Sequence, residues 1–165
     1  MMHFNNDMEI ISTFEVETKE HLELIELGIL QLANSQEKIN KDLVRAMFRS
    51  AHSIKAGSNL LELQNIGALA HALEVVLQKL LSDAFPIESE SATVFLQGID
   101  TIRELLENLQ FSDLANVTSL VEKLTEQSAP LTGRANVKRQ LQKAVINNPF
   151  QARFKVGIFR DSIHF

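Results

Sequence analysis

The chain has 165 residues, the length of one domain with room for an appendage, and this is enough to bury a real core. Its 45% hydrophobic content and mean hydropathy of −0.02 are ordinary for a soluble globular protein, and no apolar run approaches the roughly 18 residues of a membrane span. The first residues lack the basic and apolar regions of a secretory signal, so we expect a cytoplasmic location and no membrane partner. The absence of cysteine excludes disulfides, thiolate metal sites and cysteine nucleophiles.

The net charge of −5 is divided unevenly along the chain. Residues 1–133 carry 9 Lys/Arg and 20 Asp/Glu, whereas residues 134–165 carry 7 Lys/Arg and a single acidic residue. Phosphate contacts need a basic face, so the acidic body argues against nucleic acid as a partner. The basic tail is too short and too irregular to reverse that expectation.

Five helical segments are predicted by apolar residues that recur at spacings of three and four. The first three run from about Asp7 to Asn34, from Asn40, as a candidate cap, to about Ser58, and from about Gln64 to Ser82. After a turn at Pro86, Ser89 is a candidate cap for a fourth helix that continues to about Gln110. Ser112 is a candidate cap for a fifth helix, which carries Leu114, Val117, Leu120, Val121 and Leu124.

Short connections between long amphipathic helices favour an all-α fold, an up-and-down antiparallel four-helix bundle with one additional C-terminal helix. We assign residues 1–127 to this bundle and residues 128–133 to a linker, because Pro130 and Gly133 punctuate it and the charge changes sign afterwards. In the basic tail, residues 134–147 favour a short helix. The aromatic residues beyond position 149 lack a clear period, and docking on the bundle, docking on a partner and origin in a larger protein all stay open.

The second helix carries a histidine on the side opposite its apolar stripe. With an offset of roughly 100° between successive residues, the stripe gathers Leu43, Met47, Ala51, Ile54 and Ser58 on one side. His52 lies on the other side, so we expect it to be exposed. The residues that flank it are expected to form a partner-docking surface together with Gln78 of the third helix: Arg45, Phe48, Arg49, Ala56 and Asn59.

On the third helix, His71, Glu74 and Gln78 share a face that points away from the apolar stripe. If the two helices form an antiparallel hairpin, Glu74 approaches His52 across their groove. A carboxylate that accepts the proton of one ring nitrogen fixes the tautomer and leaves the lone pair of the other nitrogen facing solvent.

Two more residues on the second helix suit an incoming phosphoryl group. Lys55, one turn from His52, meets an anion, and Gly57 permits close approach where a side chain would obstruct a docking surface. A nucleophilic imidazole with cations nearby is the chemistry of a phosphoryl acceptor, since the cations offset charge on the phosphoryl oxygens.

The run from Phe48 to Ser58, FRSAHSIKAGS, followed by HALE at positions 71–74, resembles the histidine phosphotransfer (HPt) domain of chemotaxis-type histidine kinases over roughly residues 7–127. The family pattern is H-S-I-K-G-G, then H-x-x-E on the next helix. This chain departs from it at Ala56, where the family usually has its first glycine, and at residues 59–63, where the family often shows glycines and aromatics.

The resemblance implies roles for five residues and two partners. His52 is the implied phosphoryl acceptor and Glu74 its hydrogen-bond partner, while Lys55, His71 and Gly57 belong to the surrounding site. The implied partners are the ATP-binding domain of a histidine kinase, in trans or from a missing part of the protein, and an aspartate on a response-regulator receiver domain.

Metal and nucleotide sites are not expected. Di-iron bundles need Glu-x-x-His on two helices, and this chain has no Glu-x-x-His. No phosphate-cradling glycine loop is present, so we expect no cofactor and no use of ATP by the chain itself. The alternative hypothesis is a helical scaffold or adaptor that binds a signalling partner without phosphoryl transfer.

Overall fold

The computed structural model describes residues 3–35, 38–83 and 87–127. Within these ranges the chain is helical and contains no strand, which confirms the all-α prediction. The elements are α1 (His3–Asn34), α2 (Lys41–Leu60), α3 (Gln64–Asp83), α4 (Ser89–Leu106), the 3₁₀ helix η1 (Leu109–Leu114) and α5 (Thr118–Gln127). The linker and basic tail predicted from the sequence lie outside the described residues.

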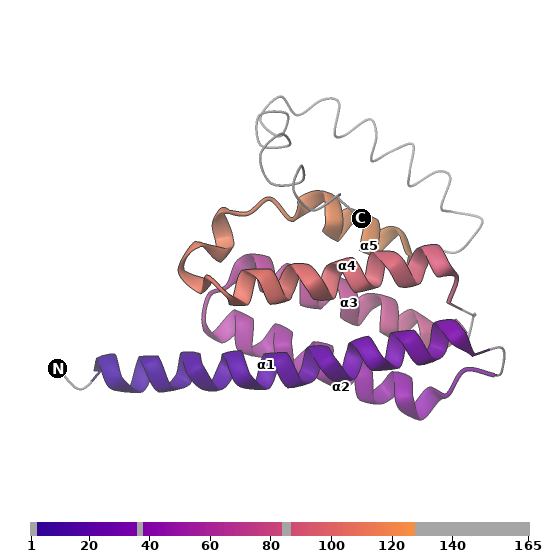
Figure 1. Ribbon diagram of the computed structural model, residues 1–165, viewed down its shortest axis with the longest axis horizontal. Helices are drawn as coiled ribbons and strands as arrows, with labels where there is room; N and C mark the ends of the chain where they lie inside the picture. Colours follow the sequence, from indigo (N-terminus) through magenta and orange to yellow (C-terminus); the bar gives the residue numbers. More distant parts are fainter. Residues whose placement is uncertain (1–2, 36–37, 84–86, 128–165) are drawn as a thin grey trace, which may run out of the picture.

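The four long helices run alternately up and down and form a bundle (Figure 1). α1 packs against α2 and α4, α3 packs against the same two helices, and α5 packs against both α3 and α4. The first turns of α1 extend past the other helices at one end of the bundle (Figure 1). Among the described helices, none combines the length and apolarity needed to cross a membrane.

The core consists of the apolar stripes that the sequence predicts. On α1 the stripe from Phe14 through Leu22, Ile25 and Ile29 is buried, and on α4 Phe95 and Ile99 are buried. On α2 the stripe is buried from Met47 to Ser58, with Leu43 only half-buried at its start. Burial of each large apolar side chain contributes about 1.5–3 kcal/mol, so this shared core is what holds the four helices together.

The cap of α2 is confirmed, but two other predicted caps are wrong. Asn40 Oδ1 accepts hydrogen bonds from the backbone N–H groups of Asp42 and Leu43, each at 3.1 Å. At α4 the cap position belongs to Glu88, so Ser89 is the first helical residue, and the helix ends at Leu106 rather than near Gln110.

Ser112 does not cap the fifth helix, because residues 109–114 form a separate 3₁₀ turn. The Ser112 hydroxyl donates to the carbonyl of Leu109 at 2.8 Å, and α5 begins only at Thr118, whose N–H donates to Asn116 Oδ1. Leu114, predicted to be part of the apolar stripe of this helix, is 73% exposed, whereas Leu120 and Leu124 are buried as expected.

The 3₁₀ turn instead caps α3, the helix that carries Glu74. The Asp113 carboxylate accepts from the backbone N–H of Gln64 at 3.2 Å and of Asn65 at 2.9 Å. The Asn65 amide donates in turn to the carbonyls of Ser112 and Ala115. A carboxylate at a helix N-terminus satisfies unpaired N–H groups and interacts favourably with the helix dipole, so η1 fixes where α3 starts.

Candidate functional site

The site lies where α2 and α3 pack together, and its centre is the Glu74 carboxylate. Glu74 Oε1 lies 2.8 Å from Nδ1 of His52 on α2. The other carboxylate oxygen, Oε2, forms an ion pair with Lys55 Nζ and lies 3.6 Å from Nδ1 of His71. The structure therefore brings four of the predicted site residues together around one carboxylate.

Exposure differs sharply within this cluster. The His52 side chain is 57% exposed, whereas the Glu74 side chain is only 10% exposed. We expected Glu74 to lie off the core, and this is wrong. The side chain is buried between α2 and α3, where His52 and Lys55 cover it. Burial of a carboxylate is tolerated here because Oε1 is hydrogen-bonded to His52 and Oε2 is paired with the charge of Lys55.

The charge state of Glu74 determines which nitrogen of His52 carries the proton. Burial raises the pKa of Glu74, but the Lys55 ammonium and the His52 ring together lower it more, so the pKa lies below its usual value. An ionised carboxylate has only acceptors, and the proton of the hydrogen bond must therefore be on Nδ1 of His52. The Nε2 lone pair is left free on the exposed ring.

Phe48 restricts the His52 ring from a second direction. The two rings stack with their centroids 6.4 Å apart and an interplanar angle of 16°. Phe48 is half-buried and packs against the core, so its own position is fixed. The imidazole is thus held by a hydrogen bond to Glu74 and by an aromatic neighbour one turn earlier on α2.

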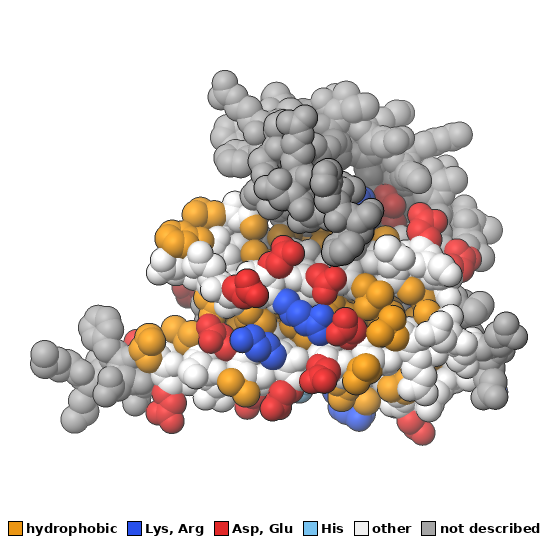
Figure 2. Space-filling view, viewed as in Figure 1, with side chains coloured by type: hydrophobic (Ala, Val, Ile, Leu, Met, Phe, Trp, Pro, Cys, Tyr) orange, Lys and Arg blue, Asp and Glu red, His pale blue; other side chains and the backbone are white. Residues whose placement is uncertain are grey.

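The other predicted docking residues lie on the surface. Arg45, Arg49, Ala56 and Asn59 are exposed on α2, and Gln78 is exposed on α3. Arg45 pairs with Asp42 at 2.7 Å, so part of its charge is already compensated. The face formed by α1 and α4 is different, because acidic side chains predominate there (Figure 2). The docking role of the α2 residues stays a prediction.

Gly57 makes a close contact inside the bundle, and its expected role in clearing a docking surface stays a prediction. A Cβ at this position would lie 2.8 Å from Cδ2 of Phe14 on α1, so the glycine allows α1 and α2 to approach. Gly28 does the same from the other helix, where a Cβ would lie 2.5 Å from Sδ of the buried Met47.

Sequence reasoning missed another histidine, His21, which lies at the α1–α2 interface. His21 Nδ1 lies 3.1 Å from the hydroxyl of Ser50, which is 4% exposed. The available signal was position, since His21 follows Phe14 by seven residues and shares its helix face. No cluster of three or more side chains suited to a metal ion occurs in the part of the chain that the structure describes.

Fold and site together define a helical bundle with an exposed histidine that is held by a hydrogen bond to a buried carboxylate. The model of the Hpt domain family matches residues 9–112, and the chain belongs to this family. Chemotaxis protein CheA of Treponema pallidum is 28% identical over 100 residues, which cover 61% of this chain and 12% of that protein. The sensor histidine kinase CheAY of Helicobacter pylori is 30% identical over 102 residues, 62% of this chain and 12% of that protein.

The structural comparison agrees on the fold. The phosphorylated P1 domain of CheA3 from R. sphaeroides, solved in complex with CheY6, matches with a TM-score of 0.59 and 23% identity. The match covers 79% of this chain and 97% of that domain. The chain therefore matches nearly the whole of a solved P1 domain but only about an eighth of the length of these two relatives.

Proposed function

We propose that this chain is the phosphoryl carrier of a two-component relay. His52 accepts a phosphoryl group from the ATP-binding domain of a histidine kinase and passes it to an aspartate of a response-regulator receiver domain. One observation carries the proposal: the exposed His52 ring is held at 2.8 Å from the buried Glu74 carboxylate. Membership of the Hpt family, the kinase relatives and a P1 domain solved with CheY6 support the two partner classes.

In the first transfer, Nε2 of His52 attacks the γ-phosphorus of ATP held by the kinase. The bond between this phosphorus and the bridging oxygen breaks, and ADP leaves with the electron pair. The proton on Nδ1 remains hydrogen-bonded to Glu74, whose negative charge stabilises the positive charge that develops on the ring. Lys55, one turn along α2, offsets charge on the phosphoryl oxygens.

In the second transfer, a carboxylate oxygen of the receiver aspartate attacks the phosphorus. The N–P bond breaks, its electron pair returns to Nε2, and the neutral imidazole is restored with its proton still on Nδ1. Arg49, together with Arg45, whose charge Asp42 partly compensates, places positive charge on the exposed side of α2, which favours the approach of an acidic partner surface.

The test is phosphorylation by a CheA-type kinase core that lacks its own phosphotransfer domain, with labelled ATP. We expect an acid-labile, alkali-stable phosphoprotein, and we expect the label to disappear in His52→Gln. The variant His71→Gln is the control for the acceptor: it removes the other histidine near the Glu74 carboxylate but leaves the His52 ring in place, so the protein should still accept label. Label that persists in His52→Gln would show that His52 is not the acceptor. If the signalling partner works equally well with this variant, the scaffold hypothesis is favoured.

A further inference from the structure

An open groove of about 350 Å³ lies on the side of α2 that faces α1. It lies between the first half of α1 and the last turns of α2. Its apolar lining includes Ile10 and Phe14 from α1 and Leu60 and Leu61 from the end of α2. Leu60 is 78% exposed and Ile10 is 47% exposed, so large apolar side chains border this groove without being covered by the described residues.

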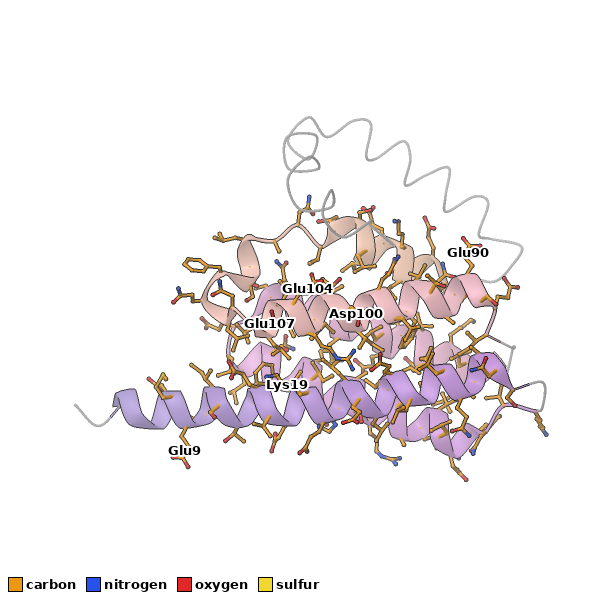
Figure 3. All side chains as sticks on the ribbon, viewed as in Figure 1. Glu9, Lys19, Glu90, Asp100, Glu104 and Glu107 are labelled. Carbon is orange, nitrogen blue, oxygen red and sulfur yellow. The ribbon has the colours of Figure 1, made fainter. Side chains whose placement is uncertain are left out.

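The charge of the groove selects for a basic occupant. Glu9 and Glu17 line it, and no lysine or arginine among the described residues does. Glu9 extends from α1 away from α4 (Figure 3). The exposed side of α2 around His52 has the opposite sign, with arginines at positions 45 and 49. A surface of one sign attracts a partner of the other sign, so an acidic partner suits the His52 side and a basic, apolar segment suits the groove.

The chain contains such a segment beyond the described residues. Residues 150–165 include four phenylalanines, three Lys/Arg and only one acidic residue. We propose that this segment, residues 150–165, binds in the groove between α1 and α2. Its apolar side chains would cover the exposed apolar lining, and its cations would meet Glu9 and Glu17.

The length of the intervening chain permits this contact. The described chain ends at Gln127, whose Oε1 accepts a hydrogen bond from Ser91 near the start of α4, 2.6 Å away. The groove lies toward the opposite end of the bundle, about 30 Å away for helices of 20 residues. Residues 128–149 span up to roughly 70 Å when extended, and still about 45 Å if residues 134–147 are helical, so the segment can reach the groove.

The absence of cysteine from the natural chain makes disulfide trapping a clean test. In the full chain, Thr13→Cys places a thiol at the groove, and Gln151→Cys places one in the segment. The matched control combines Gln151→Cys with Gln97→Cys, an exposed position on α4. If the segment binds the groove, its local concentration there is raised, and we expect the intramolecular disulfide to form about tenfold faster at position 13 than at position 97.

A charge arm of the same experiment tests the reason for binding. The double variant Glu9→Gln/Glu17→Gln should slow trapping at position 13 several-fold at low salt, whereas Glu20→Gln/Glu23→Gln, which removes the same charge elsewhere on α1, should not. Equal trapping rates at positions 13 and 97 would overturn the proposal. A disulfide that forms only between two chains would overturn it in favour of a second copy as the occupant. Neither arm depends on phosphorylation of His52.

Discussion

The two sides of α2 show how one helix supports both chemistry and packing. Toward α3 it presents His52 and Lys55 to the buried Glu74 carboxylate, whose Oε1 is hydrogen-bonded to His52 and whose Oε2 is ion-paired with Lys55. Toward α1 it presents Gly57 and the buried Met47, and this interface depends on close contact with Phe14 and Gly28. The carboxylate on the α3 side is buried among polar partners that hold it in place. On the α1 side, close packing of the helices depends on two glycines that have no side chain.

The interface between α1 and α4 also contains a carboxylate, Glu26, and comparison with it shows how Glu74 differs. Between α1 and α4, Glu26 forms an ion pair with Arg103, and the hydrogen bond from Arg103 is the main cause that lowers the pKa of Glu26. Both carboxylates are therefore held ionised by a cation on a neighbouring helix. Only Glu74 also binds an exposed imidazole, so we assign orientation of a reactive group to Glu74 and a structural role to Glu26.

The largest effect is expected when the two carboxylates, Glu74 and Glu26, are removed in turn and the variants are compared. Glu74→Ala should lower the rate of His52 phosphorylation about 100-fold, because the ring loses the group that fixes its tautomer and direction. Glu26→Ala should leave the rate unchanged. The measurement is single-turnover labelling by the kinase core, with circular dichroism to verify folding. Equal losses in the two variants would mean that Glu74 acts through stability alone.

A smaller effect is expected on the α1 side of α2. Gly57→Ala places a Cβ against Phe14, and overpacking of this kind costs about 1–3 kcal/mol, of which the better helix propensity of alanine returns about 1 kcal/mol. We therefore expect denaturant unfolding to show a loss of about 1 kcal/mol, with the phosphorylation rate of the folded protein retained. A lost rate at unchanged stability would instead support the predicted role of Gly57 in the docking surface.

The smallest effect concerns pH. Since the pKa of Glu74 in the folded state lies below its ordinary value of 4.5, the ionised carboxylate stabilises the fold above about pH 4.5. This contribution is lost as the pH falls through the lower folded-state pKa. The free energy of unfolding of Glu74→Gln should therefore depend less on pH in the acid range than that of the unaltered protein. Glu20→Gln, at an exposed position on α1, is the control, and an equal change in both variants would contradict the assignment.

The sequence predicted the bundle and the contact between His52 and Glu74 because both follow from local periodicity. Helical phase places His52 outside the apolar stripe, and the spacing of His71 and Glu74 places both on one face, whatever the rest of the chain does. Burial is different, because it depends on what the neighbouring helix contributes. Glu74 is buried since Lys55 and His52 of α2 meet it, and Gly57 faces Phe14 because of the way α1 crosses α2, which no single-helix pattern encodes.

The missed caps have a related cause. Ser89 and Ser112 have the side chain of a helix cap, but a cap also needs free N–H groups in reach. At Ser112 the chain forms a 3₁₀ turn, and the neighbouring Asp113 caps α3 instead, through a contact across 48 and 49 positions of sequence. Such long-range capping cannot be recognised from composition around the helix itself.

The hydrogen bonds from the start of α3 to the Asp113 carboxylate also determine how far this domain can be truncated. The family match ends at residue 112, one residue before the carboxylate that holds the first N–H groups of α3. A fragment that stops at that boundary would keep His52, Lys55 and Glu74 yet release the end of the helix on which Glu74 is carried. The smallest fragment that keeps both the His52–Glu74 contact and the N-terminal cap of α3 therefore extends at least through Ala115, whose carbonyl accepts a hydrogen bond from the Asn65 side chain.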